Sequence, residues 1–259
     1  MRYFVVDAFT DQPFHGNPAG VCLPEADLPD AVMQAIAAQN NLSETAFAAP
    51  AGDHWALRWF TPAAEVDLCG HATLGTAAVL FDEGLASGDT LAFDTRSGRL
   101  TVTREDGRLV MDFPRHDPRP IAVTDAMRRA VAPAAIVAAA AAGDDLLLEL
   151  ADETAVRTLV PDLAATAALD YRGVVVTARG DDCDMVSRFF VPRLGVPEDP
   201  VTGSTHTALT PYWAAKLGKE SLVARQLSAR GGTLWCTLAG DRVRIAGHVR
   251  RYLTGGIAV

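Results

Sequence analysis

The chain has 259 residues, of which 49% are apolar, and this is enough to bury one large core or two of ordinary size. Its formal net charge is −9 and its lysines and arginines form no stripe, which argues against a nucleic-acid partner. The four cysteines (Cys22, Cys69, Cys183, Cys236) are scattered without CxxC spacing, which is typical of free thiols in a reducing compartment.

The chain carries no pattern of a targeting or membrane segment. Its N-terminus has no basic stretch followed by an apolar run, so no signal peptide is expected. The longest weakly polar stretch, residues 130–143, contains Pro133 and is too short to cross a bilayer. The sequence therefore predicts a cytoplasmic protein with no membrane partner.

The first fifth of the chain alternates between strand and helix patterns. Residues 3–6 predict a strand, residues 13–20 are dense in turn formers, and residues 21–23 return to strand. A helix is predicted from Asp30, after Pro29, to the pair Asn40-Asn41, because its apolar residues recur at helical spacing. A strand resumes over residues 43–47 and places Glu44 close to a loop-to-strand junction.

Two look-alike segments, residues 58–73 and 188–206, stand half a chain apart. In each, an Arg-aromatic-aromatic-x-Pro block with strand character is followed by a short acidic loop and then a Gly that begins an apolar helix. The blocks are 130 residues apart, and the two glycines, Gly70 and Gly203, are 133 apart. Such a repeat indicates that the chain contains two copies of one structural plan.

The predicted helices of the two copies are residues 72–83 and 204–217. Each ends before a glycine, Gly84 or Gly218, of the kind that terminates helices. The first is apolar nearly all round, which predicts a helix buried on every side. The second contains Pro211, where we expect a kink or a break.

The repeat continues into two predicted β-hairpins, with turns at Asp106-Gly107 and Gly240-Asp241. The natural linker is the proline-rich segment 114–120. Residues 121–170 are Ala-rich and predict helix and loop without chemistry. We expect an N-terminal domain of residues 1–115, to which the segment 247–259 returns, and a C-terminal domain of residues 118–246.

Both glycine-started helices present backbone N–H groups at their first turn, and such groups favour an anion. A small carboxylate would suit two such starts facing one cleft. The alternative is that Gly70 and Gly203 only permit tight turns into packed helices.

The side chains around these starts include several candidates for acid/base work. Glu44 lies between Leu42 and Phe47, where burial would raise its pKa toward working pH; alternatively it is a surface residue. Asp199 is either a second acid or a loop cap, and His71 either a proton relay or a satisfied polar group. The pair Ser204-Thr205 can cap the helix or bind a carboxylate, and the N-cap is the default role of Ser204.

The sequence predicts no metal and no cofactor. His15, His71 and His206 fall in loop-rich regions that could line a cleft, but they lack the spacing of zinc sites. No P-loop or GxGxxG motif is present, and Ser204 is not in a nucleophile elbow.

The motifs of the chain, taken together, resemble those of the PhzF family of phenazine biosynthesis. The resemblance rests on motifs that follow the family's order across about 200 residues: Asp7-Ala8-Phe9-Thr10, Gly16-Asn17-Pro18-Ala19, Asn41-Leu42-Ser43-Glu44-Thr45-Ala46-Phe47, Glu65-Val66-Asp67-Leu68-Cys69-Gly70-His71-Ala72-Thr73 and Glu198-Asp199-Pro200-Val201-Thr202-Gly203-Ser204-Thr205-His206. Residues 116–170 contribute nothing to it.

The resemblance implies a diaminopimelate-epimerase-like α/β fold, with two similar domains, each a curved sheet around a central helix, and the active site between them. It implies a cofactor-independent homodimer that isomerises a small, cyclic carboxylic acid by a proton shift; the family's type reaction acts on a dihydro-hydroxyanthranilate. By resemblance the catalytic positions are Glu44, His71 and Asp199. The substrate-binding positions are Asn17, Gly70, Ala72, Gly203, Ser204 and Thr205.

Two other functions stay open. Related racemases use one thiol from each half. Here Cys69 is adjacent to the first helix start, but the second copy has Thr202, Gly203 and Ser204 and no cysteine. An amino-acid racemase or epimerase would therefore have Cys69 as its single thiol base. A non-catalytic protein that binds small carboxylates is the third possibility. The resemblance does not identify the substrate.

Overall fold

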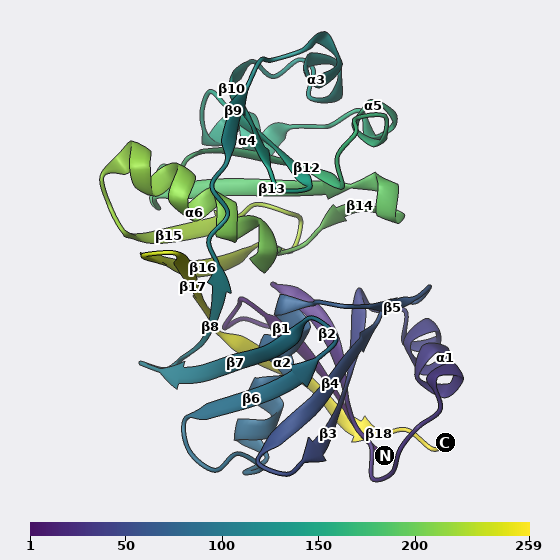
Figure 1. The fold of residues 1–259 in the computed structure, drawn as a ribbon. Helices are drawn as coiled ribbons and strands as arrows, with labels where there is room; N and C mark the ends of the chain where they lie inside the picture. The colour runs from purple at the N-terminus through teal and green to yellow at the C-terminus, as the bar shows by residue number, and fades with distance from the viewer. The chain divides into compact units, whose positions relative to one another are not determined.

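A computed structural model describes all 259 residues and divides the chain into two units (Figure 1). Unit 1 contains residues 1–112 and 246–259, and unit 2 contains residues 113–245. The sequence prediction placed the corresponding boundaries at 115/118 and 246/247. Among the helices, none combines the length and the apolar character that crossing a bilayer requires.

Unit 1 is a sheet that surrounds one helix, with a second helix outside it. Its elements are β1 (Arg2–Ala8), β2 (Asn17–Leu23), α1 (Asp30–Asn40), β3 (Glu44–Ala51), β4 (His54–Phe60), β5 (Glu65–Val66), α2 (Gly70–Asp82), β6 (Thr90–Thr95), β7 (Gly98–Glu105), β8 (Arg108–Pro114) and, from the end of the chain, β18 (Val249–Gly256).

Unit 2 has the same kinds of element in a similar order. They are β9 (Arg119–Ile121), α3 (Asp125–Ala130), β10 (Ile136–Ala142), β11 (Asp145–Leu150), α4 (Glu153–Thr158), α5 (Leu163–Ala167), β12 (Gly173–Arg179), β13 (Met185–Val191), the 3₁₀ turn η1 (Pro192–Leu194), β14 (Val196–Asp199), α6 (Gly203–Leu217), β15 (Ser221–Gln226), β16 (Gly232–Ala239) and β17 (Arg242–Gly247).

The strand pairings confirm the internal repeat. In unit 1, β1–β2 is antiparallel, β2–β3 parallel, β3–β4 and β4–β5 antiparallel, β4–β6 parallel and β6–β7 antiparallel. In unit 2 the series β10–β11, β11–β12, β12–β13, β13–β14, β13–β15 and β15–β16 has the same alternation. The duplication thus reaches back to β1 and β10, well beyond the two segments that reveal it in the sequence.

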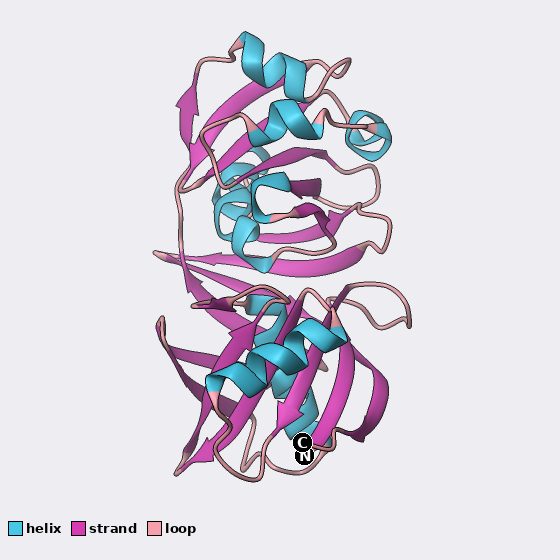
Figure 2. Ribbon diagram, turned by 90° about the vertical axis from the view of Figure 1, so that its right-hand side faces the viewer, coloured by secondary structure: helices cyan, strands magenta, loops and turns pink.

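The two glycine-started helices occupy the centres of their units, as the apolar sequence of α2 predicted. Leu74, Val79 and Leu80 of α2 are fully buried, and α1 lies on the outer side of the unit 1 sheet (Figure 2). A side-chain carbon at Gly75 would lie 2.6 Å from a methyl carbon of Val6, so glycine lets the helix approach β1 closely. In unit 2 a separate apolar cluster, which includes Leu146, packs beneath the short helices.

Three local predictions were wrong. Residues 17–20, with their turn-like composition, already belong to β2. The Ala-rich stretch 136–142 is strand β10 instead of helix or loop, and β11 follows it. Helix α6 runs unbroken through Pro211 from Gly203 to Leu217.

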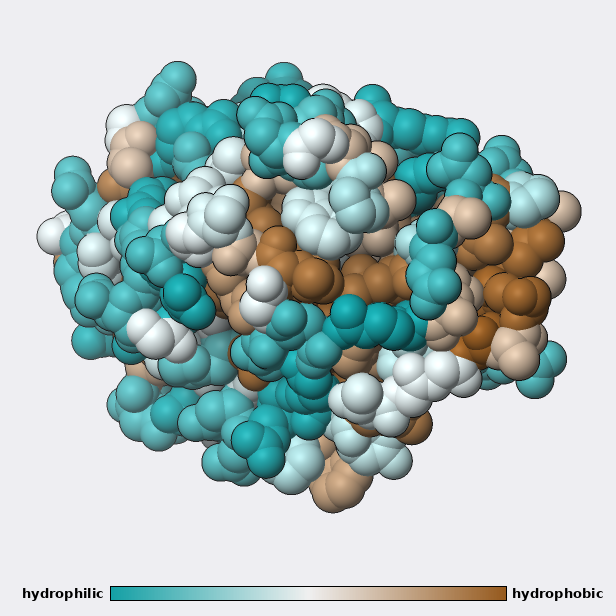
Figure 3. Space-filling view, turned by 90° about the horizontal axis from the view of Figure 1, so that it is seen from below, coloured by the Kyte–Doolittle hydropathy of each residue, from teal (hydrophilic) through white to brown (hydrophobic).

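The face of the molecule seen in Figure 3 is mostly polar, with apolar side chains in patches. Among the exposed large apolar residues of unit 1, Phe14 and Tyr252 contact each other edge to face, with ring centroids 5.8 Å apart. The four cysteines form no disulfide, as their spacing predicted.

Candidate active site

In unit 1 the structure brings Glu44 and His71 together. Glu44 is the first residue of β3, which lies parallel to β2, and His71 is the second residue of α2. The carboxylate oxygen Oε2 of Glu44 lies 3.2 Å from Nε2 of His71, a contact distance without hydrogen-bond geometry. The Glu44 side chain is only 20% exposed, so it is not the surface residue of the alternative interpretation.

His71 is buried and neutral at ordinary pH. Burial lowers the pKa of its imidazole to about 4, and a hydrogen bond to the Pro18 carbonyl only partly opposes this shift. Asn17, which is fully buried, places its amide nitrogen 3.3 Å from His71 Nδ1. The Ser43 hydroxyl donates to Oδ1, the side-chain amide oxygen of Asn17, at 3.5 Å. Asn17 therefore lies beside the imidazole and can fix the orientation of the ring.

The start of α2 completes this cluster. Cys69 is the N-cap residue, and its Sγ lies 3.5 Å from His71 Nδ1. The side chain of Cys69 makes no capping hydrogen bond, so it satisfies none of the first-turn N–H groups, which include those of Gly70 and Ala72. Ala72 itself is fully buried, and what it can offer a ligand is its backbone. The cluster thus combines a carboxylate, a neutral imidazole, a thiol and a helix N-terminus.

In unit 2 the loop before α6 is held by polar side chains. Asp199, the last residue of β14, accepts a hydrogen bond from the Thr202 hydroxyl, which matches a loop cap. Gln226 is almost fully buried; it accepts from the Thr202 backbone N–H at 2.8 Å and donates to the Asp199 carbonyl at 2.8 Å. These bonds fix the approach to Gly203, the first residue of the helix.

The expected N-cap role of Ser204 is wrong. Thr202 is the N-cap residue of α6, and it makes no side-chain capping bond. Ser204 is instead the second residue of the helix, with its Oγ 3.5 Å from Nη2 of Arg172. The Thr205 hydroxyl donates back to the Thr202 carbonyl at 3.0 Å, and Thr205 is buried.

Arg172 and Asp145 were not predicted from the sequence. Arg172 Nε donates to Asp145 Oδ1 at 2.9 Å, and its Nη2 bonds Oδ2 of the same carboxylate. Burial raises the pKa of the Asp145 carboxyl, and the guanidinium opposes that rise. An Arg or an Asp beside an apolar strand is an ordinary pattern, so no sequence signal distinguishes this pair. The buried Gln226 was missed for the same reason.

The repeat gives Arg172 a defined counterpart position. The pairing registers of β3–β4 and β12–β13 coincide when the two Arg-to-Pro blocks are matched. With that match, Arg172 falls one residue before Gly173, the counterpart of Glu44. When the two helix-start glycines, 133 residues apart, are matched instead, Ser204 is the counterpart of His71. Each unit therefore holds an ionisable side chain against the start of its central helix, a carboxylate in unit 1 and a guanidinium in unit 2.

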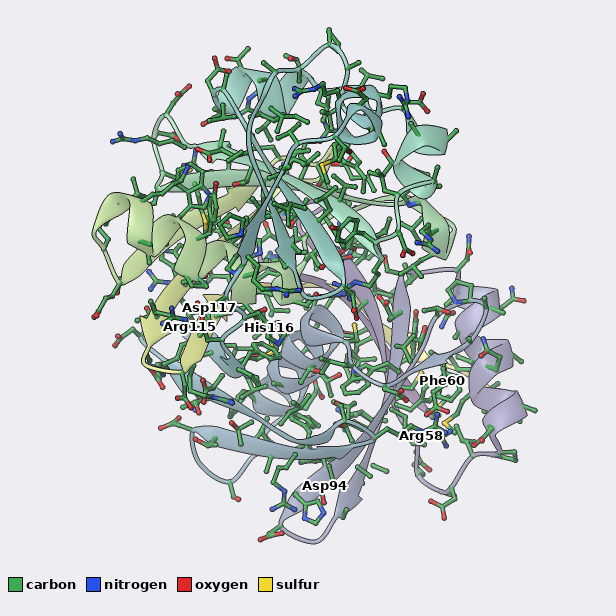
Figure 4. All side chains as sticks on the ribbon, turned by 45° about the horizontal axis from the view of Figure 1, so that its top comes forward. Arg58, Phe60, Asp94, Arg115, His116 and Asp117 are labelled. Atoms are coloured by element: carbon green, nitrogen blue, oxygen red, sulfur yellow. The ribbon has the colours of Figure 1, made fainter.

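The loops that lead to both helix starts are tied by equivalent ion pairs. Arg58 binds Glu65 through Nε at 2.7 Å, and Arg188 binds Glu198 through Nε at 2.8 Å. Both guanidinium groups also lie over a phenylalanine ring two residues on; Arg58 and Phe60 are labelled in Figure 4. Such a bidentate pair adds geometric constraint as well as energy.

The two other histidines named as possible cleft residues, His15 and His206, do not join the cluster. His15 is exposed and its Nδ1 lies 3.0 Å from the Pro13 carbonyl. His206 is buried inside α6 instead of lying in a loop, with its Nδ1 2.7 Å from the Thr202 carbonyl. Burial lowers the pKa of His206 to about 4.

Comparisons with known proteins agree with this architecture. The family model described as phenazine biosynthesis-like protein, PhzC-PhzF, matches residues 6–259. An uncharacterized isomerase of Pseudomonas aeruginosa is 52% identical over 259 residues, covering 99% of this chain and 98% of the relative. A crystal structure of a PhzF-family phenazine biosynthesis protein from Enterococcus faecalis superposes with a TM-score of 0.97 at 46% identity, covering 100% and 99% of the two chains.

A more distant likeness shows the fold alone. A probable proline racemase from Agrobacterium radiobacter has a TM-score of 0.66 at 11% identity, over 100% of this chain and 93% of the other. The predicted diaminopimelate-epimerase-like fold is confirmed by these neighbours and by the two units built on one plan. The chain belongs to the PhzC-PhzF family of phenazine biosynthesis-like proteins.

Proposed function

We propose that this protein is an isomerase that shifts a proton on a small, cyclic carboxylic acid, with Glu44 as the group that takes and returns the proton. The observation that carries the proposal is the contact of 3.2 Å between Glu44 and a buried, neutral His71. A carboxylate with a neutral imidazole beside it can remove a proton from carbon and deliver it at a second position. The names of the isomerase relatives support the reaction class.

The proposed substrate is an anion because a helix N-terminus favours negative charge, and the N-cap side chain of α2, Cys69, does not cap the first-turn N–H groups. Developing negative charge in the transition state would be stabilised by the same donors. In unit 2 we propose, on the family resemblance, that the substrate is contacted by Asp199, Gly203, Ser204 and Thr205. We also propose that Arg172, which contacts Ser204, adds positive charge there. We also propose, on the same ground, that the enzyme is a homodimer and needs no cofactor.

The first experiment identifies a substrate and tests Glu44 on it. Cyclic carboxylic acids would be screened for binding, and each hit followed for deuterium uptake from solvent. On the substrate found, Glu44→Gln should lower kcat by about 10²–10⁴-fold, because it removes general acid/base catalysis while keeping the shape of the side chain. Its melting temperature should stay close to that of the wild type. Full turnover by the Glu44→Gln protein would rule out the role assigned to Glu44.

A second candidate, a racemase with Cys69 as base, is favoured only by the 3.5 Å contact between Cys69 Sγ and His71. The counterpart position in unit 2 is Thr202, whose hydroxyl bonds Asp199, so no second thiol is available there. The same assay separates the two functions. Cys69→Ser should keep deuterium exchange under the isomerase proposal and lose it under the racemase alternative.

A further inference from the structure

The cluster at the start of α2 has the composition of a transition-metal site. Glu44, Cys69 and His71 offer a carboxylate oxygen, a thiol sulfur and an imidazole nitrogen, all within 4.8 Å of one another. Oxygen, nitrogen and thiolate sulfur are the donors that Zn²⁺ accepts in proteins, and three protein ligands leave its fourth position open. The sequence did not predict this because the three residues lack a zinc spacing.

A buried nitrogen of this cluster lacks a hydrogen bond. His71 Nε2 makes none, although the His71 side chain is only 8% exposed and Glu44 Oε2 lies 3.2 Å away. A buried polar atom without a hydrogen bond costs free energy, and a bound cation would remove that cost.

The distances are close to those that zinc requires. Bonds of about 2.0–2.3 Å in a tetrahedral arrangement place ligand atoms roughly 3.3–3.8 Å apart. The Glu44–His71 contact of 3.2 Å is near that range already. Cys69 Sγ contacts the other ring nitrogen at 3.5 Å, so its side chain has to rotate toward the carboxylate to share one ion.

A second trio in unit 2 shows what distinguishes the first. Glu153, Asp182 and Cys183 also lie within 4.8 Å of one another. However, their carboxylates are already bound by arginines: Arg157 pairs with Glu153, and Arg225 donates to Asp182 at 2.6 Å. This trio contains no histidine, and burial raises the pKa of the Cys183 thiol to about 11, which disfavours the thiolate that a metal needs.

We propose that Glu44, Cys69 and His71 form a binding site for Zn²⁺, and that the ion inhibits the enzyme reversibly by occupying the proton-transferring carboxylate. The inhibition rests on the proposed function of Glu44, whereas the binding of the metal does not.

The test uses the whole chain, freed of metal by a chelator, and Zn²⁺ alone as the probe. Competition with a chromophoric chelator should show one tightly bound Zn²⁺ per chain. Cys69→Ser, His71→Gln and Glu44→Gln should each weaken binding by at least the roughly 10–100-fold that loss of even an outer-shell partner costs. Cys183→Ser is the matched control and should bind Zn²⁺ like the wild type.

Co²⁺ gives a second readout that does not depend on affinity. The wild-type protein should show a thiolate-to-cobalt charge-transfer band, the band should be absent from Cys69→Ser, and it should persist in Cys183→Ser. Circular dichroism checks that each variant is folded. A wild type that binds no Zn²⁺, or a cobalt–thiolate band that survives in Cys69→Ser, would overturn the proposal.

The outcomes also separate this site from the proposed function. If the wild-type protein binds Zn²⁺ and Glu44→Gln keeps full turnover, the metal site is supported and the catalytic role of Glu44 is rejected. If Glu44→Gln loses turnover and the wild-type protein binds no Zn²⁺, the catalytic role of Glu44 is supported and the metal site is rejected. With both proposals right, a substrate identified as above should be turned over by the chelator-treated enzyme, and added Zn²⁺ should stop it.

Discussion

At the scale of single residues, burial sets the charge of the two helix-start histidines. His71 and His206 each lie in the first turns of a central helix, and burial lowers the pKa of both to about 4. His71 therefore contacts Glu44 as a neutral imidazole and not as a cation.

The same two histidines predict an acid-sensitive fold. An unfolded chain has a histidine pKa near 6.5, so between about pH 6.5 and 4 it binds more protons than the folded protein. The free energy of unfolding should therefore fall as the pH falls through this window, by on the order of 3 kcal/mol for each histidine.

Urea unfolding at several pH values would check this with His206→Gln as the comparison. Replacing one of the two histidines should remove about half of their acid-dependent loss. A difference between wild type and variant that stays constant from neutral pH down to the acid end of the window would contradict the prediction.

The Arg172–Asp145 pair gives a second prediction at this scale. Arg172→Met leaves the buried Asp145 carboxylate without its bidentate partner, so unfolding should become easier by about 1–3 kcal/mol at neutral pH. The loss should shrink as the pH falls, because protonated Asp145 has no charge to compensate. A double-mutant cycle with Asp145→Asn measures the coupling by urea unfolding, and a coupling free energy near zero would show that the pair is not energetically linked.

At the scale of elements, α6 shows how a helix continues through a proline. Pro211 has no N–H to give to the carbonyl of Thr207, four residues earlier. That carbonyl instead accepts from the backbone N–H of His116 at 3.2 Å, and the His116 ring lies 3.2 Å from the Thr207 hydroxyl. The predicted break therefore does not occur, since a segment of the proline-rich linker supplies the missing donor.

The linker itself is fixed to unit 2 by its polar groups. Arg115 donates through its backbone to the Asp241 carbonyl at 2.9 Å and through Nε to Asp117 at 2.6 Å. Arg115, His116 and Asp117 follow one another along the ribbon in Figure 4. The segment is thus an ordered part of unit 2 and not a free tether.

Strand β10 shows how pairing overrides local preference. Alanine is the best helix former, so an alanine run predicts a helix. Here residues 136–142 pair with β11 on one side and with β9 on the other, which satisfies their backbone groups within the sheet. The repeat explains the choice, because β10 is the counterpart of β1 and its place in unit 2 requires a strand.

At the scale of the whole molecule, the chain closes unit 1 with its last strand. Strand β18 pairs with β1 from Arg2 to Ala8, and β1 pairs with β2 on its other side. Phe4 and Val6 of β1 are almost fully buried. Unit 1 therefore depends on residues from both ends of the sequence.

Removal of residues 249–259 should unfold unit 1 and leave unit 2 largely intact. The deletion exposes one edge of β1 and its backbone groups, whereas unit 2 has its own apolar core. Hydrogen exchange followed by mass spectrometry should show lost protection within residues 1–112 only. Deletion of Ala258-Val259, which are exposed, is the matched control and should change nothing. Native protection of β1 and β2 in the longer deletion would show that β18 is dispensable.

The sequence by itself determined the parts of this protein that local chemistry controls. The apolar run of α2 predicts a buried helix, Asn41 and Gly218 mark helix ends because both adopt left-handed backbone angles, and the repeated Arg-to-Pro blocks reveal the duplication. Glu44 and His71 were identified by their motifs. Tertiary structure decided what depends on distant partners: the contact of Glu44 with His71 and Cys69, the strand at β10, the unbroken α6 and the placement of Arg172 beside Ser204. These features follow from strand pairing and burial, which join residues far apart in the chain and leave no trace in the local pattern.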